Sequence, residues 1–173
     1  YPACELVLTE EERRNGVARI QKEAEKTAEK FRKEMKTEEA YRIKSMADQI
    51  AEETMEYGIT AGLDAYLSYF CEERVSLLDY LKKEDSIVFL DETVRTIERG
   101  QSTETEFSES MKQRLEKGYI LPGQMRELFP CKEILAKINQ RRCVAMAALD
   151  MKCNQLNIKD RIAIESCTVN PYN

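Results

Sequence analysis

The sequence predicts an α/β protein in which a long antiparallel helical hairpin precedes part of a parallel sheet with flanking helices. Two long segments with apolar residues at three-to-four-residue spacing predict the hairpin. A continuous apolar run, Ile87–Leu90, is followed by alternating helix and strand patterns, which are typical of βαβ organisation. We therefore divide the 173 residues into a helical part (1–84) and an α/β part (85–173) within one structural unit.

The hairpin is predicted from two helices, about 9–35 and 37–57. A short apolar run at 3–8 predicts an edge strand, and Thr9 and Glu12 then have the spacing of a capping box. The first helix has one narrow apolar stripe: Val17, Ile20, Ala24, Phe31 and Met35. The stripe of the second helix contains Ile43, Met46, Ala47, Ile50, Thr54 and Tyr57, and Gly58 is placed to end it. Two interpretations stay open, a pair that only closes its own seam and an arm that also binds a partner.

The remaining segments predict short helices and three strands. The aromatic stretch 61–81 predicts one or two short buried helices that pack in the core. Strands are expected at 86–90, 143–149 and 161–169, the first as a buried parallel strand, with helices at about 105–117 and 132–140. Three strands make only a partial sheet. Because the sequence starts at Tyr1 and stops after an apolar run, we expect both ends to be cut points in a longer protein.

Composition narrows the classes of function. The net charge of −5 and the pI near 5.1 argue against an independent nucleic-acid binder. No apolar run approaches the roughly 18 residues that span a bilayer, and no signal peptide is visible, so we expect a soluble, cytoplasmic protein without membrane contact. The chain has no histidine and no C-x-x-C pair, which argues against zinc. We expect reduced cysteines that pack as small hydrophobic groups: Cys4, Cys71, Cys131, Cys143, Cys153 and Cys167.

One motif has chemical meaning. The apolar run Ile87–Leu90 followed by Asp91 and Glu92 has the form of a Walker B strand, in which the aspartate holds Mg²⁺ and the glutamate polarises the attacking water. The phosphate-binding loop G-x-x-x-x-G-K-[ST] that this chemistry needs is absent from the chain. Without histidine, a Ser-His or Cys-His nucleophile cannot form. We therefore predict no catalytic residue, cofactor or metal site in this chain, and Asp91 and Glu92 as a degenerate remnant.

Several short blocks are spread over nearly the whole chain: Tyr1-Pro2-Ala3, Glu39-Ala40 with Arg42, Gly62–Phe70, Ser76–Leu81, Ile87–Glu92 and Tyr119–Pro122. These blocks resemble the excision-repair protein UvrB and the UvrB-like N-terminal module of the transcription-repair coupling factor (Mfd) family. The departures favour the Mfd family. Thr93-Val94 follows Glu92 where UvrB has the histidine of its D-E-S-H motif, strand 144–149 is followed by Asp150, and 166–173 resembles the S-V-N-x-Y-N segment of Mfd.

The resemblance implies a fold and a context. The fold is part of a RecA-like (P-loop NTPase-like) domain that has lost its nucleotide site. The parent protein is implied to be an ATP-dependent DNA translocase that uses ATP and Mg²⁺. It would link stalled RNA polymerase to nucleotide excision repair by recruiting UvrA. Contacts with UvrA, RNA polymerase and DNA are expected through the parent, and this chain is expected to pack against the remainder of the same protein.

Two alternatives are carried alongside. In a UvrB-type ATPase fragment, Asp91 and Glu92 would coordinate Mg²⁺. An unrelated helical-hairpin adaptor would have no parallel strand at Ile87–Leu90.

Overall fold

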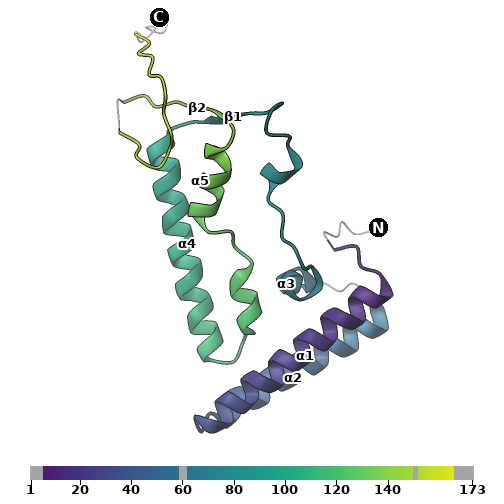
Figure 1. Ribbon diagram of the computed structural model, residues 1–173. Coiled ribbons are helices and arrows are strands. Elements are labelled where there is room, and N and C mark those ends of the chain that lie inside the picture. Colours follow the sequence, from purple (N-terminus) through teal and green to yellow (C-terminus); the bar gives the residue numbers. More distant parts are fainter. Residues whose placement is uncertain (1–5, 59–61, 150–151, 166–173) are drawn as a thin grey trace, which may run out of the picture.

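The hairpin forms one arm of the molecule. The computed structural model describes residues 6–58, 62–149 and 152–165. Helices α1 (Glu10–Lys33) and α2 (Thr37–Tyr57) run antiparallel along each other (Figure 1). The predicted capping box is present, because the Thr9 hydroxyl accepts a hydrogen bond from the Glu12 amide at 3.2 Å and the Glu12 carboxylate accepts one from the Thr9 amide at 2.7 Å. The sequence therefore located the start of α1 to the residue.

The seam of the hairpin belongs to the larger of the two hydrophobic cores formed by the described residues. Ile20, Ala24 and Phe31 of α1 are buried against Ile43 and Ala47 of α2, as the spacing predicted. The prediction was wrong for two members of the stripes. Met35 lies in the turn between the helices at φ 60° and is exposed, and the side chain of Tyr57 is exposed at the end of α2.

Three short helices connect the arm to the rest of the chain: η1 (Leu63–Tyr66), α3 (Leu67–Phe70) and η2 (Leu77–Tyr80). The expectation of core packing is confirmed for the aromatic rings of Tyr66, Tyr69 and Phe70. It was wrong for Leu77, Tyr80 and Leu81, whose side chains are exposed. Because η2 is a single 3₁₀ turn, only one of its faces can pack inward.

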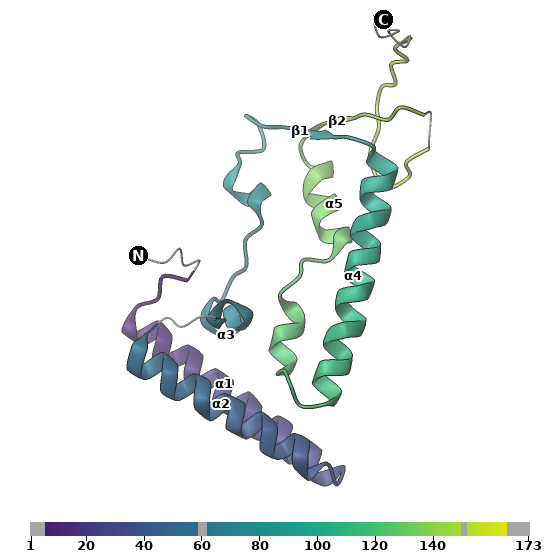
Figure 2. The same cartoon turned by 180° about the vertical axis from the view of Figure 1, so that it is seen from behind.

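The α/β half contains a two-stranded parallel sheet. Strand β1 (Ile87–Leu90) is followed by α4 (Thr93–Glu116), η3 (Pro122–Arg126), α5 (Cys131–Asn139) and strand β2 (Arg142–Ala145). The strands pair in parallel, with Phe89 beside Val144. Both views show α4 and α5 side by side on the same side of the sheet (Figures 1 and 2). A second core forms there around Ile97, Ile138, Cys153 and Leu156.

The sheet is less buried than the sequence predicted. Successive side chains of a strand point to opposite faces. Val88 and Leu90 pack against the second core, whereas Ile87 and Phe89 are 52% and 62% exposed. Strand β1 is thus parallel, as predicted, but the prediction that it is buried was wrong, because the helices of the described residues cover one face alone.

Other boundaries also differ from the prediction. Helix α4 begins at Thr93 and not near Thr105, because Val94 and Ile97 pack on the second core although their segment has few apolar residues. Strand β2 stops at Ala145, and residues 6–8 and 161–165 are not strands. The remaining residues of those two predicted strands, together with Cys4, Asp150, Cys167 and the blocks 1–3 and 166–173, lie outside the described residues.

The described cysteines differ in their burial. Cys71, Cys131, Cys143 and Cys153 are free thiols; Cys153 is part of the second core, but Cys143 is exposed. Packing as a small hydrophobic group therefore holds for Cys153 and not for Cys143.

Within the described ranges, no helix is long and apolar enough to cross a membrane.

Candidate functional site

Asp91 and Glu92 form the turn between β1 and α4, at the carboxyl end of the strand. This is the edge where the sequence placed them. Asp91 is exposed, and its carboxylate accepts a hydrogen bond from the next amide, that of Glu92, at 3.1 Å. Among the residues that the structure describes, no group of three or more His, Cys, Asp or Glu side chains is arranged to hold a metal ion.

Glu92 differs from its neighbour in backbone and in contacts. Its φ of 45° and ψ of 54° lie in the left-handed region, which costs a residue other than glycine about 1–2 kcal/mol. Its Oε1 accepts a hydrogen bond from the amide of Ala148 at 3.0 Å. The carboxylate that would polarise the attacking water in a Walker B motif is therefore bonded to the backbone that follows β2.

We call the residues after β2, Met146–Leu149, the 146–149 segment. Leu90 and Thr93 also hold this segment at the edge of the sheet. The Met146 amide donates to the Leu90 carbonyl at 2.8 Å, which extends the pairing of the strands by one bond. Thr93 is almost fully buried, and its amide donates to the Met146 carbonyl at 3.3 Å. The Thr93 hydroxyl lies 3.2 Å from the Leu90 carbonyl and 3.4 Å from the Met146 carbonyl.

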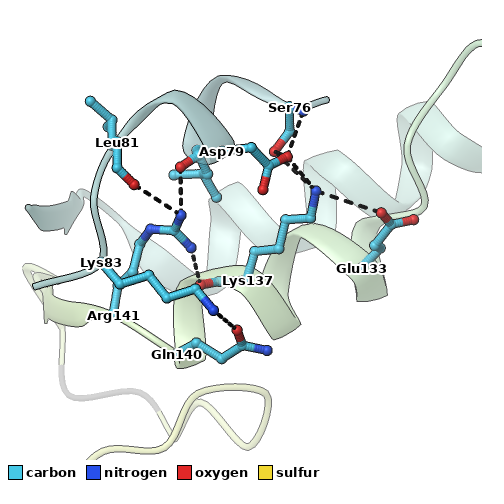
Figure 3. Close-up of polar contacts among 9 residues, drawn as sticks. Ser76, Asp79, Leu81, Lys83, Glu133, Lys137, Gln140 and Arg141 are labelled. Atoms are coloured by element: carbon cyan, nitrogen blue, oxygen red, sulfur yellow. Dashed lines mark hydrogen bonds and ion pairs between the residues drawn. The ribbon is translucent and has the colours of Figure 1, made fainter. Parts of the chain in front are cut away.

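A second polar cluster, which the sequence analysis missed, joins η2 to α5 (Figure 3). We call Ser76, Asp79, Lys137 and Arg141 the η2–α5 clamp. The Asp79 carboxylate accepts hydrogen bonds from the amide and the hydroxyl of Ser76, each at 2.7 Å, and pairs with the Lys137 ammonium at 2.6 Å. The hydrogen bond from Lys137, followed by those from Ser76, lowers the pKa of Asp79. The signal was present in the sequence, because Ser76 and Asp79 have capping-box spacing.

Arg141 completes the clamp from the end of α5. Its guanidinium donates to the carbonyls of Lys137 at 2.8 Å, Leu78 at 2.5 Å and Leu81 at 3.4 Å. It thus closes the last turn of α5 and fixes the chain that leads into β1 (Figure 3). The residues of the Ser76–Leu81 block have different roles. Leu78 packs against the second core and Asp79 pairs with Lys137, whereas the side chains of Leu77 and Tyr80 are exposed.

Among the described residues, polar contacts attach the hairpin to the α/β half at two points. Glu23 of α1 accepts hydrogen bonds from the Tyr69 hydroxyl and, at 3.0 Å, from the Gly123 amide. Burial of the Tyr69 ring, with Glu23 beside the hydroxyl, raises the pKa of Tyr69. These contacts join α1, α3 and η3.

At the second point Arg42 of α2 lies 4.4 Å from the centre of the Tyr119 ring and donates to the Lys117 carbonyl. Between these two residues, Gly118 adopts φ +67° against the backbone of Glu39. A side chain there would be strained in conformation and too close to Glu39. Both attachment points are thus structural contacts between the hairpin and the α/β half.

Comparisons with known proteins give partial relatives. No protein-family model matches the sequence. UvrABC system protein B of Kosmotoga olearia is 32% identical over 128 residues, which are 71% of this chain and 19% of that protein. The protein of the same name from Fervidobacterium nodosum is 33% identical over 147 residues, 81% of this chain and 22% of that protein. That of Thermotoga maritima is 30% identical over 128 residues.

These matches show a relation to UvrB over part of the chain. The chain spans about a fifth of the length of the curated relatives it matches.

Proposed function

We propose that the chain is a non-catalytic segment of a transcription-repair coupling factor. It supports the UvrB-like module that links stalled RNA polymerase to nucleotide excision repair. The relation to proteins named as component B of the UvrABC system supports a role in excision repair. Thr93 and Val94, in place of the Ser-His of UvrB, support the coupling factor over UvrB itself.

The observation that carries the non-catalytic proposal is the state of Glu92. Its carboxylate is bonded to the Ala148 amide. The sequence has no phosphate-binding loop that would bring a nucleotide to it. A carboxylate that polarises water must reach the attacking oxygen. We therefore assign no catalytic residue, cofactor or metal to this segment, and place ATP, Mg²⁺ and DNA translocation elsewhere in the parent protein.

The uncovered face of the sheet supports a scaffold role. Ile87, Phe89 and Val144 are 52%, 62% and 42% exposed, on the face opposite the helices. Parallel sheets are normally covered on both faces, since their crossover helices lie on both sides. We propose that this face and the open edges of β1 and β2 pack against the remainder of the parent chain, which would complete a RecA-like sheet. Contacts with UvrA, RNA polymerase and DNA would be made by the parent protein.

A second candidate is favoured by the names of the relatives, which are all UvrB. In a UvrB-type excision-repair ATPase, Asp91 and Glu92 would act on Mg²⁺ and water within the complete protein. The parallel β1 with these two carboxylates at its carboxyl end is compatible with that function. It also argues against the unrelated adaptor, which would have no such strand.

The two candidates predict different effects of one substitution in the parent protein. If the segment is non-catalytic, Asp91→Asn leaves the rate of ATP hydrolysis and the release of stalled RNA polymerase within about twofold of wild type, since the translocase site lies elsewhere. If the parent is a UvrB-type ATPase, the same change lowers the rate of hydrolysis by at least about tenfold, because a metal-binding carboxylate is lost. Asp85→Asn, an exposed aspartate before β1, is the matched control.

The 173-residue chain provides a simpler test. Titration with Mg-ATP in a calorimeter should give no binding tighter than millimolar. Tighter binding that Asp91→Ala abolishes would contradict the non-catalytic proposal.

A further inference from the structure

We propose that Glu92 is a positioning residue whose carboxylate fixes the 146–149 segment across the carboxyl end of β1. Glu92, which resembles part of an ATPase motif, would then hold the backbone of the 146–149 segment over the carboxyl end of the sheet. The inference rests on the proposed absence of nucleotide chemistry here, because a glutamate held by a backbone amide is not free to act on a water molecule.

The contacts follow one another along the segment. The Met146 amide donates to Leu90 at the end of β1, and the Met146 carbonyl accepts the Thr93 amide at the start of α4. Two residues further on, the Ala148 amide donates to Glu92 at 3.0 Å. Residues 90, 92 and 93 thus bind three backbone groups of the segment, two on Met146 and one on Ala148. Without Glu92, the attachment would end at Met146 and the Ala148 amide would lose its acceptor.

The backbone of Glu92 gives an independent reason to look for a role of its side chain. Its left-handed conformation is easy for glycine and tolerable for asparagine, but it is strained for glutamate. Strained residues persist where the surrounding structure fixes them, often at positions with a role. Here the side-chain hydrogen bond to Ala148 is the contact that only a long acceptor at position 92 supplies.

Asp91 serves as a natural comparison. It is the neighbouring carboxylate of the same motif and is exposed, and its side chain bonds the amide of the next residue. The two carboxylates therefore have separate roles in the fold. A change at Asp91 alters the charge of the motif without removing the acceptor for Ala148.

Hydrogen exchange at the Ala148 amide, measured by NMR on the 173-residue chain, tests the inference. Glu92→Gly removes the acceptor and relieves the strained backbone, so the protein should stay folded while the Ala148 amide exchanges about tenfold faster. Glu92→Gln keeps a side-chain oxygen at the same reach, and exchange should stay within about twofold of wild type. Asp91→Asn, the matched control, should leave exchange at Ala148 unchanged. If Glu92→Gly fails to fold, Glu92→Asn replaces it in the test. Asparagine tolerates the backbone conformation but is one methylene shorter, so the Ala148 amide should again exchange about tenfold faster.

The outcomes separate this inference from the proposed function. Equal exchange of the Ala148 amide in wild type, Glu92→Gly and Glu92→Asn would overturn the positioning role, whatever the chain binds. Tight Mg-ATP binding by a chain whose Ala148 amide is protected by Glu92 would overturn the non-catalytic function and support the positioning role. Faster exchange of the Ala148 amide in Glu92→Gly and Glu92→Asn, with no change in Glu92→Gln and Asp91→Asn, supports the positioning role.

Discussion

Asp79 has the densest set of polar contacts among the described carboxylates. It receives two hydrogen bonds from Ser76 and an ion pair from Lys137, which also lies 3.7 Å from Glu133 and 5.1 Å from the centre of the Phe129 ring. Charged hydrogen bonds of this kind are stronger than neutral ones. At the residue scale, Asp79 thus couples η2 to α5.

The lowered pKa of Asp79 predicts a pH-dependent contribution to stability. A carboxylate whose pKa is lower in the folded than in the unfolded state stabilises the fold above its unfolded pKa of about 3.9. That contribution is lost as the pH falls from there through the folded value. Asp79→Asn should therefore lower the urea midpoint at pH 7, and its difference from wild type should shrink below about pH 4.

Urea unfolding at pH 7 and pH 3 measures this effect, and Asp85→Asn is the control, because Asp85 is exposed in the turn before β1. A difference between wild type and Asp79→Asn that stays constant with pH would show that the ion pair with Lys137 does not stabilise the fold.

Glu92 shows, also at the residue scale, why a motif does not fix the role of a side chain. The acidic pair after an apolar strand was visible in the sequence, and its place at the carboxyl end of β1 is confirmed. That Glu92 bonds Ala148 depends on a segment more than fifty positions away in sequence. Only the parallel pairing of β1 and β2 brings the two together.

At the scale of elements, close packing at α1 and α4 distinguishes two helical glycines. A Cβ on Gly16 in α1 would lie 2.1 Å from Cδ1 of Phe70, so α3 packs directly on the backbone of α1. A Cβ on Gly100 in α4 would lie 3.3 Å from the sulfur of Cys131, a tight contact that a small shift relieves.

The two glycines should therefore respond differently to alanine. Gly16→Ala should destabilise the chain by about 1–3 kcal/mol, because the Phe70 ring must move. Gly100→Ala should be neutral or stabilising by up to about 1 kcal/mol, since alanine favours helix formation. Thermal and urea unfolding of both variants measures the pair. A Gly16→Ala variant as stable as wild type would contradict the close approach of α3 to α1.

The helices were predicted with unequal success for a physical reason. α1 and α2 form most of their own core, so their apolar periodicity describes the contacts that hold them. The first half of α4 is polar apart from Val94 and Ile97, and its helical structure depends on packing against the second core. Tertiary contacts of this kind override local propensity.

At the scale of the whole molecule, the uncovered face of the sheet is the main departure from an ordinary α/β domain. Phe89 and Val144 lie side by side on it, with Ile87 nearby. The outer edges of β1 and β2 also lie open within the part of the chain that the structure describes. Exposed apolar strands with open edges promote association between chains.

Phe89→Lys should therefore act in opposite directions in two settings. In the 173-residue chain it should reduce self-association at micromolar concentration with little loss of stability, because the Phe89 side chain is 62% exposed. In the parent protein it should lower the melting temperature of the module, since a charge would be buried where the proposed scaffold covers the face.

Sedimentation of the isolated chain and thermal unfolding of the parent measure the two effects. Tyr41→Lys, on the exposed face of α2, is the control in both settings. Unchanged stability of the parent protein with Phe89→Lys would show that this face stays open there.

The sequence by itself determined the hairpin, the parallel β1 and the acidic pair at its end. Apolar spacing, a capping box and a continuous apolar run are local patterns, and the chain carries them without reference to distant residues. Tertiary structure alone decided that helices cover one face of the sheet, that Asp79 pairs with Lys137, and that Glu92 bonds Ala148. Each of these depends on which distant segments lie together, and it is the pairing of β1 with β2 across α4 and α5 that sets those neighbours.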